Sequence, residues 1–181
     1  MKKLLKLIVV LMVLLTAIVL LTGCGSEEKK DSAKKEKLTF DGEEGKITFE
    51  VPEGKGYKIS EDKEDFRTSR VQGALVGKDF TINIEFCDDY AYFFDSDFEK
   101  LKEARADYDD FKVVEYGGVK AVQYFYGSYN TYDIIFPVAN NEKYYMELSI
   151  CGAKDTEEAA KKAMENKELL EILDSIKFEA K

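Results

Sequence analysis

The chain has 181 residues, with 36 acidic and 27 basic side chains, a formal net charge of −9 and no histidine. This acidic balance argues against nucleic-acid binding, which needs clustered Lys and Arg opposite phosphate groups. Without histidine there is no Ser-His-Asp triad, Cys-His dyad or imidazole metal ligand, so we expect a protein that is not an enzyme and needs no cofactor, although carboxylate or lysine chemistry stays open.

Residues 1–24 have the order of a secretory signal peptide. Three lysines precede an uncharged apolar stretch over 7–20, and small residues and a cysteine follow as Leu21-Thr22-Gly23-Cys24. This ending resembles the lipobox of bacterial lipoproteins, in which a peptidase cuts before a cysteine that carries lipid. The alternative, an uncleaved membrane helix, needs about 20 apolar residues, more than this stretch supplies.

The lipobox resemblance implies that residues 1–23 are a signal peptide and that Cys24 receives a diacylglyceryl group. The protein would then be anchored in membrane lipid at the extracytoplasmic face of the cell membrane. Removal of residues 1–23 takes away three lysines and no acidic residue, so the formal net charge becomes −12. The segment 24–37 then predicts a disordered tether, because its polar, charged composition cannot bury enough apolar surface to become ordered. We expect residues 38–181 to form one domain and the protein to be a monomer.

The first half of this domain predicts short strands separated by turn residues. In the clearest of them, Phe80, Ile82, Ile84 and Phe86 alternate with polar residues and Cys87, which places two sets of side chains on opposite faces. The sequence then fits a helix capped by Ser96, with Glu99 three residues later, running to about 107. The strands are predicted over 38–40, 46–52, 57–60, 70–77 and 80–87.

The second half predicts four more strands, a long helical segment and a final short strand. The helix starts at Asp155 or Thr156, and Asn166 marks a possible break within it. The strands are predicted over 111–116, 119–127, 132–138, 143–151 and 176–178. Strand runs divided by two helical segments, without β-α-β alternation, indicate an α+β fold with a mainly antiparallel twisted sheet packed by two helices.

The order of these elements resembles the PsbP/Mog1-like α/β/α sandwich. The features that carry the resemblance are a Phe-Glu-Val-Pro strand over 49–52, a capped helix, a Gly-Gly turn and a C-terminal Ile-Leu-Asp-Ser-Ile-Lys-Phe segment over 172–178. The resemblance covers about residues 46–178 and implies the sandwich fold. It supplies no catalytic motif and no function, because proteins of that fold have unrelated roles.

Three groups of residues are candidate sites. Cys87 and Cys151 end two apolar strands, and they form either a disulfide or two buried free thiols. An acidic group could hold Ca²⁺ but lacks EF-hand spacing, and its last members fit a helix start better. A tyrosine-rich region is either a recognition patch or ordinary cross-strand packing. The acidic group is Asp88, Asp89, Asp95 and Asp97, and the tyrosine patch is Tyr124, Tyr126, Tyr129 and Tyr132.

These observations favour an anchored, non-enzymatic module that binds an envelope protein or peptide through the tyrosine patch. Two alternatives remain open. One is a carrier of a small molecule, lipid or ion with a pocket between sheet and helices. The other is an enzyme that uses paired carboxylates with separated pKa values.

Overall fold

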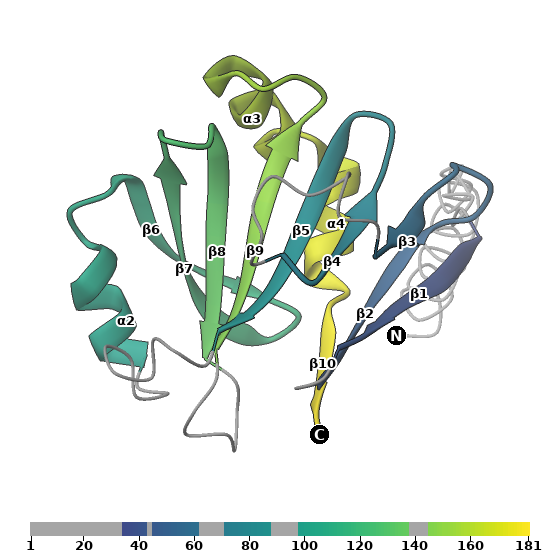
Figure 1. The fold of residues 1–181 in the computed structure, drawn as a ribbon, viewed down its shortest axis with the longest axis horizontal. Coiled ribbons are helices and arrows are strands. Elements are labelled where there is room, and N and C mark those ends of the chain that lie inside the picture. The colour runs from purple at the N-terminus through teal and green to yellow at the C-terminus, as the bar shows by residue number, and fades with distance from the viewer. Residues whose placement is uncertain (1–33, 43–44, 62–70, 88–97, 138–144) are drawn as a thin grey trace, which may run out of the picture. The chain divides into compact units, whose positions relative to one another are not determined.

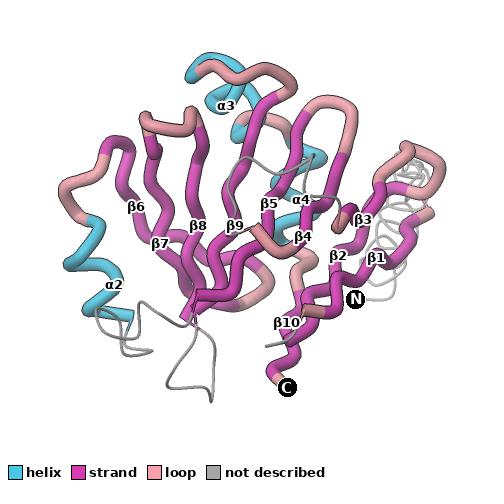
Figure 2. The backbone as a smooth tube through the Cα atoms, viewed as in Figure 1, coloured by secondary structure: helices cyan, strands magenta, loops and turns pink. Residues whose placement is uncertain are grey.

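The part of the chain described by the computed structural model comprises residues 34–42, 45–61, 71–87, 98–137 and 145–181. In these ranges it forms ten strands and three helices (Figures 1 and 2). All strand pairings are antiparallel, which confirms the predicted α+β class with a mainly antiparallel sheet. Residues Lys34–Lys181 make up one compact unit.

The strands form two sheets rather than the single sheet expected. In the small sheet, β2 lies between β1 and β10, so partners on both sides already occupy its two edges. β1 begins three residues before the predicted start of the domain, and its first residue, Lys35, pairs with Pro52. The small sheet consists of β1 (Lys35–Asp41), β2 (Gly45–Pro52) and β10 (Lys177–Ala180).

The large sheet has seven strands in the order β3-β4-β5-β9-β8-β7-β6. Tight turns join β4 to β5, β6 to β7 and β7 to β8, and the β6–β7 turn uses Gly117 and Gly118 with φ of 59° and 78°. Two residues with positive φ are typical of hairpin turns whose twist matches that of the strands. The strands are β3 (Lys58–Ser60), β4 (Gly73–Val76), β5 (Phe80–Cys87), β6 (Asp109–Tyr116), β7 (Val119–Tyr126), β8 (Thr131–Pro137) and β9 (Tyr145–Gly152).

One face of the large sheet, here called the core face, carries the main hydrophobic core. The predicted alternation in β5 is confirmed, because Phe80, Ile82, Ile84 and Phe86 all belong to this core. Phe49 of β2 packs into the same core and is fully buried. Burial of each such side chain contributes about 1.5–3 kcal/mol, which makes this core the main source of stability.

Two helices cover the core face: α3 (Glu157–Met164) and α4 (Lys167–Asp174) (Figure 1). The Thr156 hydroxyl caps α3 and the Asn166 side chain caps α4, which confirms both the predicted start and the predicted break. The C-terminal segment is thus two helices, so the described residues contain three helices where two segments were expected.

The opposite face of the large sheet, here called the polar face, has a smaller apolar cluster beneath α2 (Phe98–Arg105). Leu101 of α2 is fully buried there against Val122 of β7 and Ile135 of β8. Beyond this cluster the polar face carries charged and amide side chains, and it therefore holds most of the candidate chemistry.

Candidate functional site

Four tyrosines contact one another beside the β7–β8 turn, and we call them the tyrosine cluster. The ring of Tyr108, which follows α2, lies 4.6 Å from that of Tyr124 and 6.0 Å from that of Tyr126. The ring of Tyr126 lies 5.3 Å from that of Tyr129. Tyr124 is 3 % exposed, whereas Tyr108 and Tyr129 are 36 % and 46 % exposed. The cluster therefore runs from the interior to the surface.

The structure separates Tyr132 from the other members of the predicted patch. In β8 it pairs with Phe125, so it projects from the core face, and its ring packs 5.3 Å from that of Phe125. The Tyr132 hydroxyl donates a 2.6 Å hydrogen bond to Asp110, and its side chain is 6 % exposed. This is a correction to the predicted patch, because residues from opposite faces cannot share a surface.

Arg105 links the tyrosine cluster to the centre of the polar face. Its Nε donates a 3.2 Å hydrogen bond to the Tyr124 hydroxyl. Its guanidinium lies over the rings of Tyr108 and Tyr124, 5.4 Å and 5.6 Å from their centroids. Both distances allow a cation–π interaction. Burial raises the pKa of Tyr124, so this hydroxyl stays protonated beside the guanidinium.

The central strands of the polar face bring together a group that we call the acidic site. The register places Asn83, Ser149 and Asp133 side by side on β5, β9 and β8, and it places Glu85 opposite Glu147 in the next row. Opposite side chains in neighbouring strands have Cβ atoms about 5 Å apart. The acidic site comprises Asn83, Glu85, Asp133, Glu147 and Ser149.

Asp133 and Glu147 form a hydrogen-bonded carboxyl pair. Loss of hydration raises the pKa of Glu147 well above its ordinary value, and the negative charges of Asp133 and Glu85 raise it further. Burial also raises the pKa of Asp133, while hydrogen bonds from Thr131, Ser149 and Glu147 favour its ionised form. Glu147 therefore keeps its proton and donates it in a hydrogen bond to the Asp133 carboxylate.

Asn83 adds a second acceptor to this site. It is 3 % exposed, and its Nδ2 donates to the Cys151 sulfur at 3.4 Å. Its Oδ1 is buried and has no hydrogen-bond partner among the described residues. Because the two ends of a planar amide diverge, Oδ1 is directed away from Cys151, which lies on the side of Asn83 opposite to Glu85 and Glu147.

Cys87 and Cys151 do not form the disulfide considered from the sequence, since both are buried free thiols. β5 and β9 do pair, but their carboxyl ends lie at opposite ends of the antiparallel ladder. Cys87 lies opposite Tyr145, and Cys151 lies opposite Thr81. Six residues of strand separate the two positions, about 20 Å at 3.4 Å per residue, far beyond disulfide reach.

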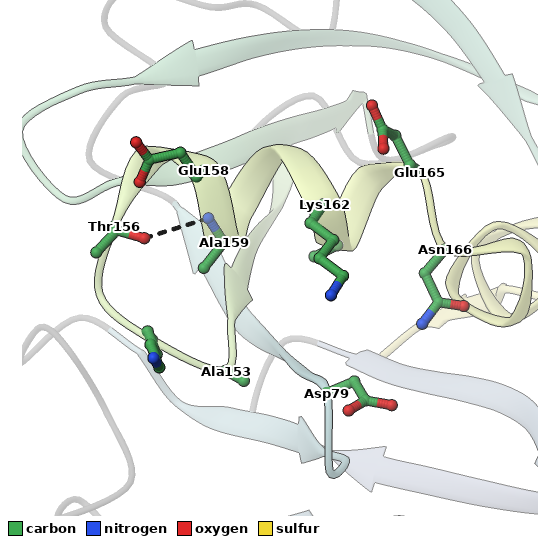
Figure 3. Close-up of a pocket in the computed structure, with 10 residues that line it drawn as sticks. Asp79, Ala153, Thr156, Glu158, Ala159, Lys162, Glu165 and Asn166 are labelled. Carbon is green, nitrogen blue, oxygen red and sulfur yellow. Dashed lines mark hydrogen bonds between the residues drawn. The ribbon is translucent and has the colours of Figure 1, made fainter.

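A pocket of about 670 Å³ lies between α3 and the turn that precedes β5 (Figure 3). Lys162 projects from α3 into this space, and Asp79 borders it from the turn (Figure 3). The rest of the lining is polar or small, and the Thr156 hydroxyl there is already engaged in capping α3. The lining residues are Asp79, Ala153, Lys154, Thr156, Glu158, Ala159, Lys162, Ala163, Glu165 and Asn166.

Several predicted features fall outside the described ranges. They include Cys24 with the lipobox, the predicted helix cap Ser96 and the four acidic residues Asp88, Asp89, Asp95 and Asp97. Within those ranges, no group of three or more Cys, Asp or Glu is arranged to hold a metal ion.

None of the helices in the described part of the chain has the length and apolar character needed to cross a bilayer.

The sequence interpretation missed the acidic site and Arg105. Asp133 and Glu147 are acidic residues inside otherwise apolar strands, in Tyr-Asp-Ile-Ile-Phe and Tyr-Met-Glu-Leu-Ser-Ile. A carboxylate in such a position is the available signal, because an acidic side chain is seldom buried without a partner. The identity of that partner depends on strand register, which the sequence did not supply.

Comparison with protein-family models and with curated proteins gives no match for this chain.

Proposed function

We propose that this protein is a lipid-anchored extracytoplasmic module that binds an envelope protein or peptide through its tyrosine cluster. The observation that carries the proposal is the continuous set of ring contacts that ends in exposed Tyr108 and Tyr129. Tyr combines apolar area with a polar tip and loses little conformational freedom on binding, which suits it to recognition surfaces. In this proposal the protein acts without catalysis, cofactor or nucleic acid, as a monomer.

The buried end of the cluster supports this role by holding the exposed rings in place. Tyr124 is packed beneath Tyr108 and is hydrogen-bonded to Arg105, so Tyr108 rests on a fixed neighbour. Tyr126 contacts both Tyr108 and Tyr129 and therefore joins the two exposed rings. Rings held in this way lose little further freedom when a partner binds.

The anchor in the proposal rests on the lipobox resemblance at Leu21-Thr22-Gly23-Cys24. The domain fold is proposed to be PsbP/Mog1-like, which the cover of α3 and α4 on one face of an antiparallel sheet supports. Mass spectrometry of protein purified from native membranes tests the anchor. A first residue Cys24 carrying a diacylglyceryl group is expected, and a retained Met1 contradicts the anchor.

Crosslinking in native membranes followed by affinity purification tests the binding surface. We expect Tyr108→Ala with Tyr129→Ala to lose the partner that the wild-type protein captures. Leu170→Ala is the matched control, because Leu170 is an apolar side chain on α4 that is 36 % exposed, like Tyr108. If the double variant captures the same partners in the same amounts as wild type, the tyrosine cluster is not the binding surface.

The alternative function is a carrier of a small molecule, lipid or ion. The pocket beside α3 has a suitable volume of about 670 Å³, but charged side chains such as Lys154 and Lys162 line it. A polar small molecule suits such a lining better than a lipid does. Extraction of the purified native protein followed by mass spectrometry tests this function, and a bound small molecule at stoichiometric amount would favour it.

A further inference from the structure

The acidic site offers three acceptor groups from three neighbouring strands. Asp133 contributes from β8, Glu147 from β9 and Asn83 from β5. The Asn83 oxygen is buried and lacks a donor among the described residues. A buried acceptor that lacks its hydrogen bond costs about 1–3 kcal/mol, so this oxygen favours a ligand that brings a donor.

The exposure of these residues gives the site a closed side and an open side. Asp133 and Asn83 are 2 % and 3 % exposed and form its floor. Glu85, Glu147 and Ser149 are partly exposed and border its opening. A small group can therefore reach the carboxyl pair from the side of β5 and β9.

The charges that face the carboxyl pair leave the site acidic. Among the described residues, Arg105 of α2 acts on Asp133 and Glu147 as a cation, and Glu85 of β5 adds a further negative charge beside Glu147. Tyr124 of β7 also faces the pair, and burial raises its pKa, so it stays neutral.

We propose that Asp133, Glu147 and Asn83 bind a primary ammonium group. An ammonium has three N–H donors and no acceptor, which matches one acceptor from each of these three side chains. A metal ion is disfavoured, because the described residues lack a group of Cys, Asp or Glu arranged to hold one. Binding proceeds by exchange: the ammonium enters, the Glu147 O–H bond breaks and its proton leaves to solvent, so the total charge of the site is unchanged.

This site lies apart from the exposed rings proposed to bind an envelope partner, and the inference does not rest on that function. Arg105 connects the two regions, since it contacts Tyr108 and Tyr124 and acts on the carboxyl pair. The two proposals can therefore fail separately. If the protein binds the free amine but does not capture its envelope partner, only the proposal for the tyrosine cluster fails. If it captures the partner but does not bind the amine, only the proposal for the acidic site fails.

Calorimetric titration of the intact protein in non-ionic detergent tests the site with two probes of equal charge. n-Butylammonium has three N–H donors, whereas butyltrimethylammonium has none. We expect n-butylammonium to bind at least tenfold more tightly and, in buffers of different ionisation enthalpy, to release protons on binding. Equal binding of the two cations, or no binding of either, overturns the proposal.

Two variants test the residues independently. Glu147→Gln and Asn83→Leu each keep the side-chain size and remove one acceptor, and each is expected to weaken n-butylammonium binding at least tenfold. Glu115→Gln on β6 is the control, because Glu115 is exposed and remote in register from the acidic site. Unchanged affinity in a variant that melts like wild type overturns the assignment, and if one variant fails to fold the other still decides it.

The ammonium could belong to a free amine or to a lysine side chain of a peptide. A short lysine peptide and its Nε-acetylated form distinguish the two sources. Tighter binding of the lysine peptide than of n-butylammonium, lost on acetylation, assigns the site to peptides. Weaker binding of the lysine peptide than of n-butylammonium assigns it to small amines, and binding that survives acetylation contradicts recognition of the ammonium.

Discussion

Glu147 of β9 donates a hydrogen bond to Asp133 of β8, so two acidic residues on neighbouring strands share one proton. The pair lies on the polar face of the large sheet, away from the main core. Arg105 and Glu85 act on it from α2 and β5. A shared proton makes the stability of the fold depend on pH in a direction that can be derived.

We expect stability to fall as pH rises above 4.5, the ordinary pKa of a Glu side chain. The pKa of Glu147 is higher in the folded state, so the folded state binds more protons and its stabilisation is lost as pH rises through that folded pKa. One proton corresponds to a slope of at most about 1.4 kcal/mol per pH unit. In urea unfolding between pH 5 and 8, the free energy of unfolding of the wild type should fall as pH rises, by no more than this slope. The same free energy should fall less steeply in Glu147→Gln.

The control for this experiment is Glu115→Gln, which removes an exposed carboxylate and should keep the wild-type slope. Identical slopes in wild type and Glu147→Gln would mean that Glu147 titrates near its ordinary pKa, and that the proton is not shared.

Cys87 and Cys151 should both be reduced in the native protein. Their positions at opposite ends of the β5–β9 ladder prevent a bridge, whatever the redox potential of the compartment. Burial raises the pKa of Cys87, so alkylation by iodoacetamide should be slow in the native protein and fast in 6 M guanidinium. A peptide pair linked through Cys87 and Cys151 in a non-reducing digest would contradict the register.

Local patterns were sufficient to predict most of the elements. The alternation of Phe80, Ile82, Ile84 and Phe86 identified a strand and its buried face, because side chains in a strand point alternately to opposite sides. The helix start at Asp155 or Thr156 and the break at Asn166 were predictable, because residues with a side-chain oxygen accept from the first free N–H groups of a helix.

Pairing over long sequence distances was not predictable from those patterns. β10 pairs with β2, so Phe178 lies opposite Ile47, and this produces a separate small sheet. The acidic site depends on the same kind of information, since only the register of three strands places Asp133, Glu147 and Asn83 in neighbouring rows. The tyrosine patch was predicted in part, because β7 fixes Tyr124 and Tyr126 on one face while Tyr132 falls on the other face of β8.

Gly152→Ala should destabilise the protein strongly. Gly152 is the last residue of β9, and a Cβ there would overlap the backbone of Ala159 in α3. The helix must move away from the sheet to make room, and overpacking of this kind costs about 1–3 kcal/mol. Thermal unfolding should show a clear loss in melting temperature.

Gly127→Ala is the matched control, because a Cβ at Gly127 meets its nearest neighbour, Phe125, at 3.7 Å, an ordinary contact distance. We expect little change in stability from it. An equal loss in the two variants would indicate that the Gly152 effect reflects glycine replacement in general and not the contact with α3.

Tyr57→Phe should weaken the attachment of α4 to the segment before β3. The Tyr57 hydroxyl donates a 2.5 Å hydrogen bond to Glu168 of α4, and Lys55 forms a 3.0 Å ion pair with the same carboxylate. Loss of this partly buried bond is expected to cost about 1 kcal/mol near pH 7 in urea unfolding. Burial raises the pKa of Glu168, but the bonds from Tyr57 and Lys55 outweigh it, so the pKa of Glu168 is lower than its ordinary value.

The sign of that shift makes the Tyr57 effect depend on pH. A carboxylate with a lowered folded pKa contributes stability above its unfolded value of 4.5, and that stability is lost as pH falls through the folded pKa. The cost of Tyr57→Phe should therefore shrink towards pH 3. In a double-mutant cycle, Tyr57→Phe should cost much less in a Glu168→Gln background than in wild type. Additive costs at pH 7 would show that the hydroxyl and the carboxylate do not interact.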